Sequence, residues 1–376
     1  MTSKVKPIRV CALTLYPYDT APGQRFRIEQ WEPYLEEFGI HIDYYPFADN
    51  QLSTILQQPG HMFRKVRLLS KSIAGRLRHL TVIRKYDAVF IYRAASIVGP
   101  AWLERLIKLL KRPIIYDFDD AIFIPDTSDA NRRFRWTKFA AKTGTLCKIS
   151  NAVTVGNNWL ADYSRNFNRN TFVIPTSIDT KIYTPVERVK AEPNRKLVVG
   201  WMGTSTSQYH LELFEPTLEK LLQKYDVEIR VISNREPSFK NVPYNWRKWT
   251  ADTEVQELSE FDIGIMPNPD DEWSKGKCAA KALQYMSMSV PTICSDIGTN
   301  REVIKDNENG FLAKNESEWL EAFEKLILDS ELRRNLGKKA RETVEREYSM
   351  IKCAKILQDV IFNVLDSNDN KNDDRN

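Results

Sequence analysis

Two series of short apolar runs, each alternating with amphipathic stretches, constrain the fold of this chain more than any other feature. The runs of the first series lie at 9–15, 41–45, 88–92, 113–116, 152–155 and 171–174, and those of the second at 197–201, 228–232, 263–266 and 292–295. Alternation of strand and helix patterns is typical of βαβ units around a parallel sheet. A chain of 376 residues suits two such domains better than one core. We therefore predict an α/β fold with two Rossmann-like halves.

The segment between the two series has the composition of a linker. Residues 184–196 contain two prolines and a high density of charge. This predicts an N-terminal domain over 1–183 and a C-terminal domain over 197–349. A last amphipathic helix is expected over 350–365, and the Asn/Asp-rich tail 366–376 is expected to be disordered.

Composition excludes several classes of function. The net charge of only +5 does not indicate a nucleic-acid binder, and the five scattered cysteines form no CxxC pair. The four histidines lie far apart in the sequence, which disfavours a His-rich zinc site. We see no signal peptide and no run of about 18 apolar residues. These features lead us to expect reduced thiols and a cytoplasmic location.

The first segment with chemical meaning is VVGWMGTSTS at 198–207, where an apolar strand runs into Gly203, Thr204 and Ser205. A helix pattern follows. Backbone N–H groups, small side chains and a helix N-terminus are the features that bind phosphate. The alternative is an ordinary strand-to-helix turn with a Ser/Thr cap, and the segment alone favours neither interpretation.

The second segment is DDEWSKGKCAAKALQYMSM at 270–288. Lys275, Lys277 and Lys281 cluster where a helix is expected to begin, and cations there oppose the helix dipole unless an anion lies among them. Lys281, Gln284 and Tyr285 share one helix face by their spacing. A lysine on a diphosphate and an amide on a ribose hydroxyl fit this pattern. The alternative is a solvated basic helix start.

The third segment, YDFDDAIF at 116–123, places Asp117, Asp119 and Asp120 after a buried strand. In open α/β sheets, ligands bind at this edge. Crowded carboxylates raise one another's pKa, which favours general-base catalysis. Asp117 and Asp119 also form a DxD pattern that could hold a divalent metal, but the lysines already supply positive charge. Helix capping by Asp119 or Asp120 is the structural alternative.

Four further residues complete the set of candidate site residues. In APGQRFR at 21–27, Gly23 permits close backbone approach, and Arg25 and Arg27 are candidates to contact an acceptor or the phosphates. Arg93 has similar standing at the end of the run 88–92. The alternative for each is a surface basic loop.

Taken in order, these segments resemble the GT-B glycosyltransferases, most closely the bacterial group 1 (GT4-like) enzymes of polysaccharide and lipid-linked glycan assembly. The stretches that carry the resemblance are IPTSIDTKIY at 174–183, GWMGTSTSQYHL at 200–211, FDIGIMP at 261–267, GKCAAKALQYMSMSVPTICSDIGTNREVI at 276–304 and NGFLA at 309–313, followed by Tyr348 and Ser349. The resemblance covers nearly the whole chain. One departure stands out: the two glutamates of the common family pattern are replaced by Gly276 and Gln284.

The resemblance implies a sugar transfer from a nucleotide sugar to a hydroxyl of a glycan or lipid-linked acceptor. It implies donor binding in the C-terminal half through Gly203, Lys281 and Gln284, acceptor binding in the N-terminal half, and a last helix that crosses back to that half. Neither a cofactor nor a metal is expected, because helix termini and cations stabilise the leaving diphosphate. In an inverting reaction Asp119 or Asp120 would deprotonate the acceptor hydroxyl. In a retaining reaction the same carboxylate would position the acceptor. The missing glutamates leave that stereochemistry open.

The segment 61–86 combines many basic residues with an apolar stripe of Leu68, Leu69, Ile73, Leu77 and Leu80, and it holds no acid between Phe63 and Lys85. Such a helix can lie on an anionic membrane, which would place the protein at the inner face of the membrane. The alternative is a helix packed on its own domain.

Two other functions compete with glycosyl transfer. A nucleotide-sugar epimerase is disfavoured by the scarcity of histidine, since such sites usually carry acids and histidines. A non-catalytic nucleotide-sugar-binding protein is disfavoured by the carboxylates at 117–120.

Overall fold

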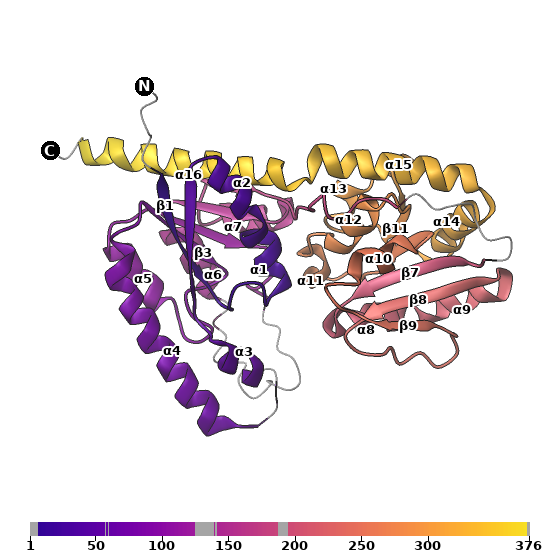
Figure 1. Cartoon of the computed structure of the whole chain (residues 1–376), viewed down its shortest axis with the longest axis horizontal. Helices are drawn as coiled ribbons and strands as arrows, with labels where there is room; N and C mark the ends of the chain where they lie inside the picture. The colour runs from indigo at the N-terminus through magenta and orange to yellow at the C-terminus, as the bar shows by residue number, and fades with distance from the viewer. Residues whose placement is uncertain are drawn as a thin grey trace. The chain divides into compact units, whose positions relative to one another are not determined.

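The computed structural model describes residues 7–56, 58, 60–124, 139, 141–186 and 195–373, which form two compact units (Figure 1). Unit 1 comprises Met1–Thr176 together with Met350–Asn376, and unit 2 comprises Ser177–Ser349. Most of the linker predicted at 184–196 lies outside the described residues.

Unit 1 is built on a parallel sheet with the order β2-β1-β3-β4-β5-β6. Its central strands are fully buried runs rich in Val, Ile and Phe, as expected for a sheet covered on both faces. The described strands are β1 (Ile8–Thr14), β2 (Ile40–Pro46), β3 (Ala88–Tyr92), β4 (Ile114–Phe118), β5 (Ala152–Val155) and β6 (Thr171–Val173).

The helices of unit 1 flank this sheet (Figure 1). They are α1 (Pro22–Arg27), the 3-10 turn η1 (Glu29–Trp31), α2 (Glu32–Glu37), α3 (Asn50–Leu56), α4 (Met62–Ile83), α5 (Trp102–Leu109), α6 (Ala141–Ile149), α7 (Asn158–Arg165) and α16 (Met350–Asp373).

The first helical region differs from its prediction. The sequence pattern predicts one helix over 25–38, whereas the structure has α1, η1 and α2 in succession. Ile28 leaves helical geometry with φ of −150° and ψ of −43°, and Pro33 at the start of α2 has no N–H to continue an earlier helix. The break lets Ile28 and Trp31 both enter the core of unit 1.

The C-terminal helix α16 belongs to the core of unit 1. Met350, Leu357, Ile361 and Val364 lie in one hydrophobic cluster with Ile28 and strand residues of the sheet. The helix runs to Asp373 instead of ending at 365, so the tail predicted to be disordered from 366 is helical over most of its length. Propagation of a helix already held by packing needs only one residue at a time, which explains why the polar residues extend it.

Unit 2 repeats the architecture with the strand order β12-β11-β10-β7-β8-β9. Its strands are β7 (Leu197–Gly203), β8 (Val227–Ser233), β9 (Asn245–Lys248), β10 (Ile263–Met266), β11 (Thr292–Ser295) and β12 (Phe311–Ala313). Its helices are α8 (Ser205–Leu213), α9 (Glu215–Lys224), α10 (Glu254–Ser259), α11 (Glu272–Lys275), α12 (Ala280–Ser287), α13 (Asn300–Val303), α14 (Glu316–Leu328) and α15 (Ser330–Glu347).

Helix α12 lies unusually close to the sheet of unit 2. A Cβ atom built on Gly264 of β10 would be 2.5 Å from the Tyr285 ring of α12, so only glycine permits this approach. The contact sets how closely α12, which carries Lys281 and Gln284, packs on β10.

The prediction of an α/β fold with two Rossmann-like halves is confirmed by these two parallel sheets. Across the described residues, every helix is too short or too polar to cross a lipid bilayer.

Candidate functional site

The carboxyl edge of the sheet in unit 2 carries a glycine turn. Strand β7 ends at Gly203, Thr204 follows in extended geometry, and α8 begins at Ser205. A Cβ atom on Gly203 would be 2.7 Å from Lys281 Cε and would also collide with the Trp201 ring. Lys281 is therefore packed directly against this turn. The Ser205 N–H is already used, because it donates to Asn234 Oδ1 at 2.7 Å.

Two of the three predicted lysines lie near His210 of α8, and one of them, Lys281, packs against the glycine turn. Lys281 Nζ lies 5.5 Å from the centroid of the Trp201 ring, and Lys277 Nζ lies 5.0 Å from that of Trp273. His210 of α8 senses both charges: burial lowers the pKa of His210, and Lys281 and Lys277 lower it further. Lys281 and Lys277 thus disfavour a further positive charge on His210, and a neighbourhood of this kind favours a bound anion.

The third lysine lies apart from this pair. Lys275 forms an ion pair with Glu272 at 2.7 Å, which raises the pKa of Lys275. Lys277 and Lys281 flank Ala279 in the sequence, and Ala279 adopts left-handed geometry with φ of 51° before α12. A non-glycine residue is strained there, and such strain gathers at functional sites.

The structure corrects the expectation for Tyr285. Its side chain is fully buried, and its hydroxyl oxygen accepts a hydrogen bond from the Met202 N–H at 2.8 Å. Burial is the main reason that the pKa of Tyr285 is raised. Tyr285 shares a helix with Lys281, but its hydroxyl holds α12 to β7 and does not face a ligand.

Gln284 takes part in a buried polar cluster that sequence reasoning missed. Its Nε2 donates to Glu254 Oε1 at 2.6 Å and to the Tyr183 hydroxyl at 3.2 Å. The Tyr183 hydroxyl donates to the same Glu254 oxygen at 2.5 Å, and Trp249 Nε1 donates to Glu254 Oε2 at 2.8 Å. Glu254 carries no motif and lies 30 positions from Gln284, so no sequence signal connects the two.

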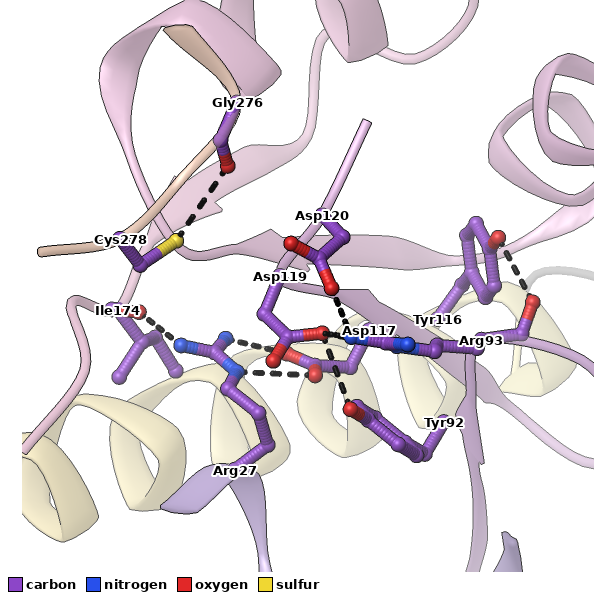
Figure 2. A network of polar contacts seen from close by, with 10 residues as sticks. All are labelled: Arg27, Tyr92, Arg93, Tyr116, Asp117, Asp119, Asp120, Ile174, Gly276 and Cys278. Atoms are coloured by element: carbon purple, nitrogen blue, oxygen red, sulfur yellow. Dashed lines mark hydrogen bonds and ion pairs between the residues drawn. The ribbon is translucent and has the colours of Figure 1, made fainter. Parts of the chain in front are cut away.

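In unit 1, two of the candidate residues form a buried ion pair (Figure 2). Arg27 donates from Nε and Nη2 to the Asp117 carboxylate at 3.0 and 2.5 Å, and both side chains are fully buried. Thr154 Oγ1 donates to the same carboxylate at 2.6 Å, and Arg27 also donates to the Ile174 carbonyl. Arg27 and Asp117 therefore do not face a ligand, contrary to expectation, because Asp117 lies inside β4 and not beyond its end.

The two aspartates that follow β4 converge on Arg93 (Figure 2). Arg93 donates to Asp119 Oδ1 from Nε at 2.9 Å and from Nη2 at 2.7 Å, and to Asp120 Oδ2 at 2.5 Å. The Tyr92 hydroxyl donates to Asp119 Oδ1 at 3.0 Å. A Cβ atom on Gly23 would be 2.5 Å from the Tyr92 hydroxyl, so the glycine admits this arrangement.

The electrostatics of this cluster differ from the expectation of mutually raised carboxylate pKa values. Burial acts to raise the pKa of Asp119, but Arg93 and Arg27 outweigh it, and the net pKa of Asp119 is lowered. Arg93 adopts left-handed geometry with φ of 60°. Burial opposes its charge, yet Asp119 and Asp120 raise the pKa of Arg93 well above its usual value. Arg93 and Asp119 are therefore both charged at physiological pH and form an ion-paired arginine–carboxylate array with Asp120.

Two other predicted features lie apart from the array. Arg25 forms an ion pair with the exposed Asp19 at 3.1 Å. In α4, the predicted apolar stripe largely faces the protein, since Leu68 is buried and Leu69 and Ile73 pack against the same cluster. Arg76 is buried as well and donates to three backbone carbonyls.

Comparison with known proteins supports the fold. Residues 276–343 match the sequence model of the glycosyl transferases group 1, while no curated protein matches the chain by sequence. The structure is similar to sucrose-phosphate synthase from Thermosynechococcus elongatus, with a TM-score of 0.68, 14% identity, and coverage of 96% of this chain and 100% of that one. A glycosyltransferase from Rickettsia africae gives a TM-score of 0.66 at 15% identity, covering 96% and 99%.

A third similar structure carries ligands. HepE from Anabaena, in complex with UDP and glucose, gives a TM-score of 0.59 at 12% identity and covers 94% of this chain and 98% of that one. At such identities the likeness establishes the fold. It is the two-domain GT-B fold, and the matched sequence segment contains Lys277, Lys281 and Gln284.

Proposed function

We propose that this chain, which has the GT-B fold of the glycosyltransferases, transfers a sugar from a nucleotide-sugar donor to an acceptor hydroxyl. The observation that carries the proposal is Lys281 packed against the Gly203 turn, with Lys277 near the same His210, within the segment that matches the group 1 glycosyl transferases. Two cations and a glycine turn at the carboxyl edge of a parallel sheet suit a diphosphate.

The donor chemistry follows from this placement. In the transfer, the acceptor oxygen forms a bond to the anomeric carbon while the bond from that carbon to the diphosphate oxygen breaks. Negative charge grows on the leaving diphosphate, and preorganised cations stabilise such charge strongly. We assign this role to Lys277 and Lys281, and we propose that the reaction needs no metal, so that EDTA leaves the rate unchanged.

On the acceptor side, the aspartates divide into two roles. Asp119 accepts from both Arg93 and Tyr92, and its lowered pKa makes it a weak base, which suits a positioning role. Asp120 has the more exposed carboxylate of the two. We propose that Asp120 contacts the acceptor hydroxyl and either takes its proton or orients it.

We further propose that the acceptor is a glycan or a lipid-linked glycan, that the transferred group is a hexose, and that the product serves cell-surface polysaccharide synthesis. The support is the resemblance of the chain to enzymes of that kind.

We also propose contact with a membrane, through the N-terminal end of α4. Three of the four large apolar side chains exposed on α4 lie at its N-terminal end, namely Met62, Phe63 and Val66, while Leu77 is exposed further along the helix. Phe63 is 95% exposed. The basic residues Arg64, Lys65 and Arg67 lie among them. We propose that this end of α4 holds the protein at the inner face of an anionic membrane.

Flotation with anionic liposomes tests this contact. Phe63→Ser is expected to reduce the floated fraction severalfold, whereas Leu109→Ser, at another exposed apolar position on α5, is the matched control. Equal flotation of both variants and the wild type would contradict the proposal.

The function itself is tested by thermal shift with UDP, GDP, ADP and their sugars, followed by transfer assays. We expect one nucleotide to stabilise the protein, Lys281→Met to abolish the shift, and Asp120→Asn to keep the shift but lose transfer. Stabilisation without transfer by the wild type would indicate a binding protein, and conversion of the sugar while still attached would indicate an epimerase.

A further inference from the structure

The buried cluster around Glu254 in unit 2 fixes which way round the Gln284 amide points. The Glu254 carboxylate can only accept hydrogen bonds, so it must face the NH2 group of Gln284. The Tyr183 hydroxyl donates its hydrogen bond to the same carboxylate, so its oxygen can only accept from Gln284. This contact also requires the NH2 group of Gln284. Both contacts select one amide orientation.

The Gln284 carbonyl oxygen points away from this cluster, because the two ends of an amide lie on opposite sides of its carbon. Among the described residues the oxygen has no hydrogen-bond partner, and it is not one of the buried polar atoms that are sealed from solvent. Gln284 lies one helical turn after Lys281, on the same face of α12. An acceptor-only oxygen is thereby held one turn from the lysine that flanks the Gly203 turn.

We infer that Glu254 is a positioning residue for nucleoside recognition: it makes Gln284 present a carbonyl oxygen to a ribose hydroxyl of the donor. The inference rests on the proposed function of unit 2. Without Glu254, a glutamine offers either its NH2 group or its oxygen to a ligand. With Glu254 in place, Gln284 offers only an acceptor to the ligand, as a glutamate at position 284 would. Unlike a glutamate, Gln284 adds no negative charge close to the negatively charged diphosphate.

The contacts on Glu254 support this directional role. Its two oxygens accept from three donors, namely Gln284, Tyr183 and Trp249, and its side chain is largely buried. A carboxylate held on both oxygens cannot rotate to release the amide. The ribose then meets an acceptor whose orientation is set before binding, which lowers the entropic cost of the contact.

The experiment compares nucleotide affinity with affinity for deoxy analogues. Wild-type protein is titrated calorimetrically with UDP, GDP and ADP, and the tightest of these is then compared with its 2′-deoxy and 3′-deoxy forms. We expect one deoxy form to bind about tenfold more weakly, the size of one lost hydrogen bond. For Glu254→Gln we expect this discrimination to fall to about twofold or less, with the thermal unfolding midpoint measured in parallel.

A reciprocal exchange separates orientation from simple structural damage. Gln284→Glu brings two carboxylates into the contact that now measures 2.6 Å, and we expect nucleotide affinity to fall at least about tenfold. The double variant Glu254→Gln/Gln284→Glu restores one carboxylate and one amide, and it should recover most of the affinity and the discrimination.

The outcomes are distinct. If no nucleotide binds to wild-type protein, the proposed function fails. If nucleotides bind but Glu254→Gln keeps full discrimination, or if the double variant is no better than Gln284→Glu, the inference about Glu254 is overturned while the proposed function stands.

Discussion

Replacing Asp117 by asparagine should destabilise unit 1 severely, because it removes the charge of a fully buried ion pair. Asp117 accepts three hydrogen bonds, two from Arg27 and one from Thr154, between 2.5 and 3.0 Å. Asparagine keeps the volume but removes the carboxylate that is hydrogen-bonded to the Arg27 guanidinium, and it turns an NH2 group toward other donors. Breaking a buried pair in this way costs about 3–5 kcal/mol in the free energy of unfolding.

Urea unfolding followed by circular dichroism measures this loss. With a slope of about 3 kcal/mol/M for a unit of this size, the midpoint of the unit 1 transition should fall by about 1–1.7 M. Asp162→Asn is the matched control, since its pair with Arg165 is exposed on both sides and exposed pairs contribute about 0–1 kcal/mol. A midpoint for Asp117→Asn within about 0.3 M of the control would refute the view that this pair is structural.

Three further outcomes follow from the sites. Gly23→Ala places a Cβ atom 2.5 Å from the Tyr92 hydroxyl, so we expect kcat to fall at least about tenfold with little change in nucleotide Kd, measured by steady-state kinetics and calorimetry. Gly203→Ala places a Cβ atom 2.7 Å from Lys281 Cε, and for this variant the nucleotide Kd should rise about tenfold. Burial and nearby lysines lower the pKa of His210 in the folded protein. The neutral His210 therefore adds its whole contribution to the free energy of unfolding above the unfolded pKa of about 6.5, and this contribution is lost as the pH falls toward the folded pKa. A bound diphosphate should raise this pKa, which proton uptake in buffers of different ionisation enthalpy would reveal.

Both glycine predictions share one control. Gly75 lies in α4, and a Cβ atom added to it would meet no neighbouring atom within 4 Å, so Gly75→Ala should leave kcat and Kd unchanged. Equal effects at all three glycines would indicate general destabilisation. If His210→Gln takes up as many protons as the wild type when the diphosphate binds, His210 is not the group whose pKa rises.

The sequence predicts those features of the fold and the site whose signal is local. Gly203 and Lys281 stand in recognisable patterns, a strand-to-glycine turn and a basic helix start, and the structure brings them together. The two parallel sheets follow from the alternation of apolar runs. Both signals depend on residues within one or two elements of the chain.

The sequence does not predict the surroundings of a side chain when they depend on distant residues. Asp117 and Asp119 look equivalent in YDFDD, yet Asp117 meets Arg27, 90 positions earlier, and Asp119 meets Arg93. Glu254 could not be singled out, since only the fold places it against Gln284. In α4 the same apolar spacing fits packing and membrane binding, and only burial shows that most of the stripe is used for packing.

The most direct test of the central claim is mass spectrometry of a reaction that contains the chain, the nucleotide sugar that binds it and a pool of glycan and lipid-linked acceptors. We predict an acceptor heavier by one sugar residue and an equal amount of free nucleoside diphosphate, with both products lost in Lys281→Met. Glycosyl transfer would be contradicted if the donor binds but every sugar remains on its nucleotide.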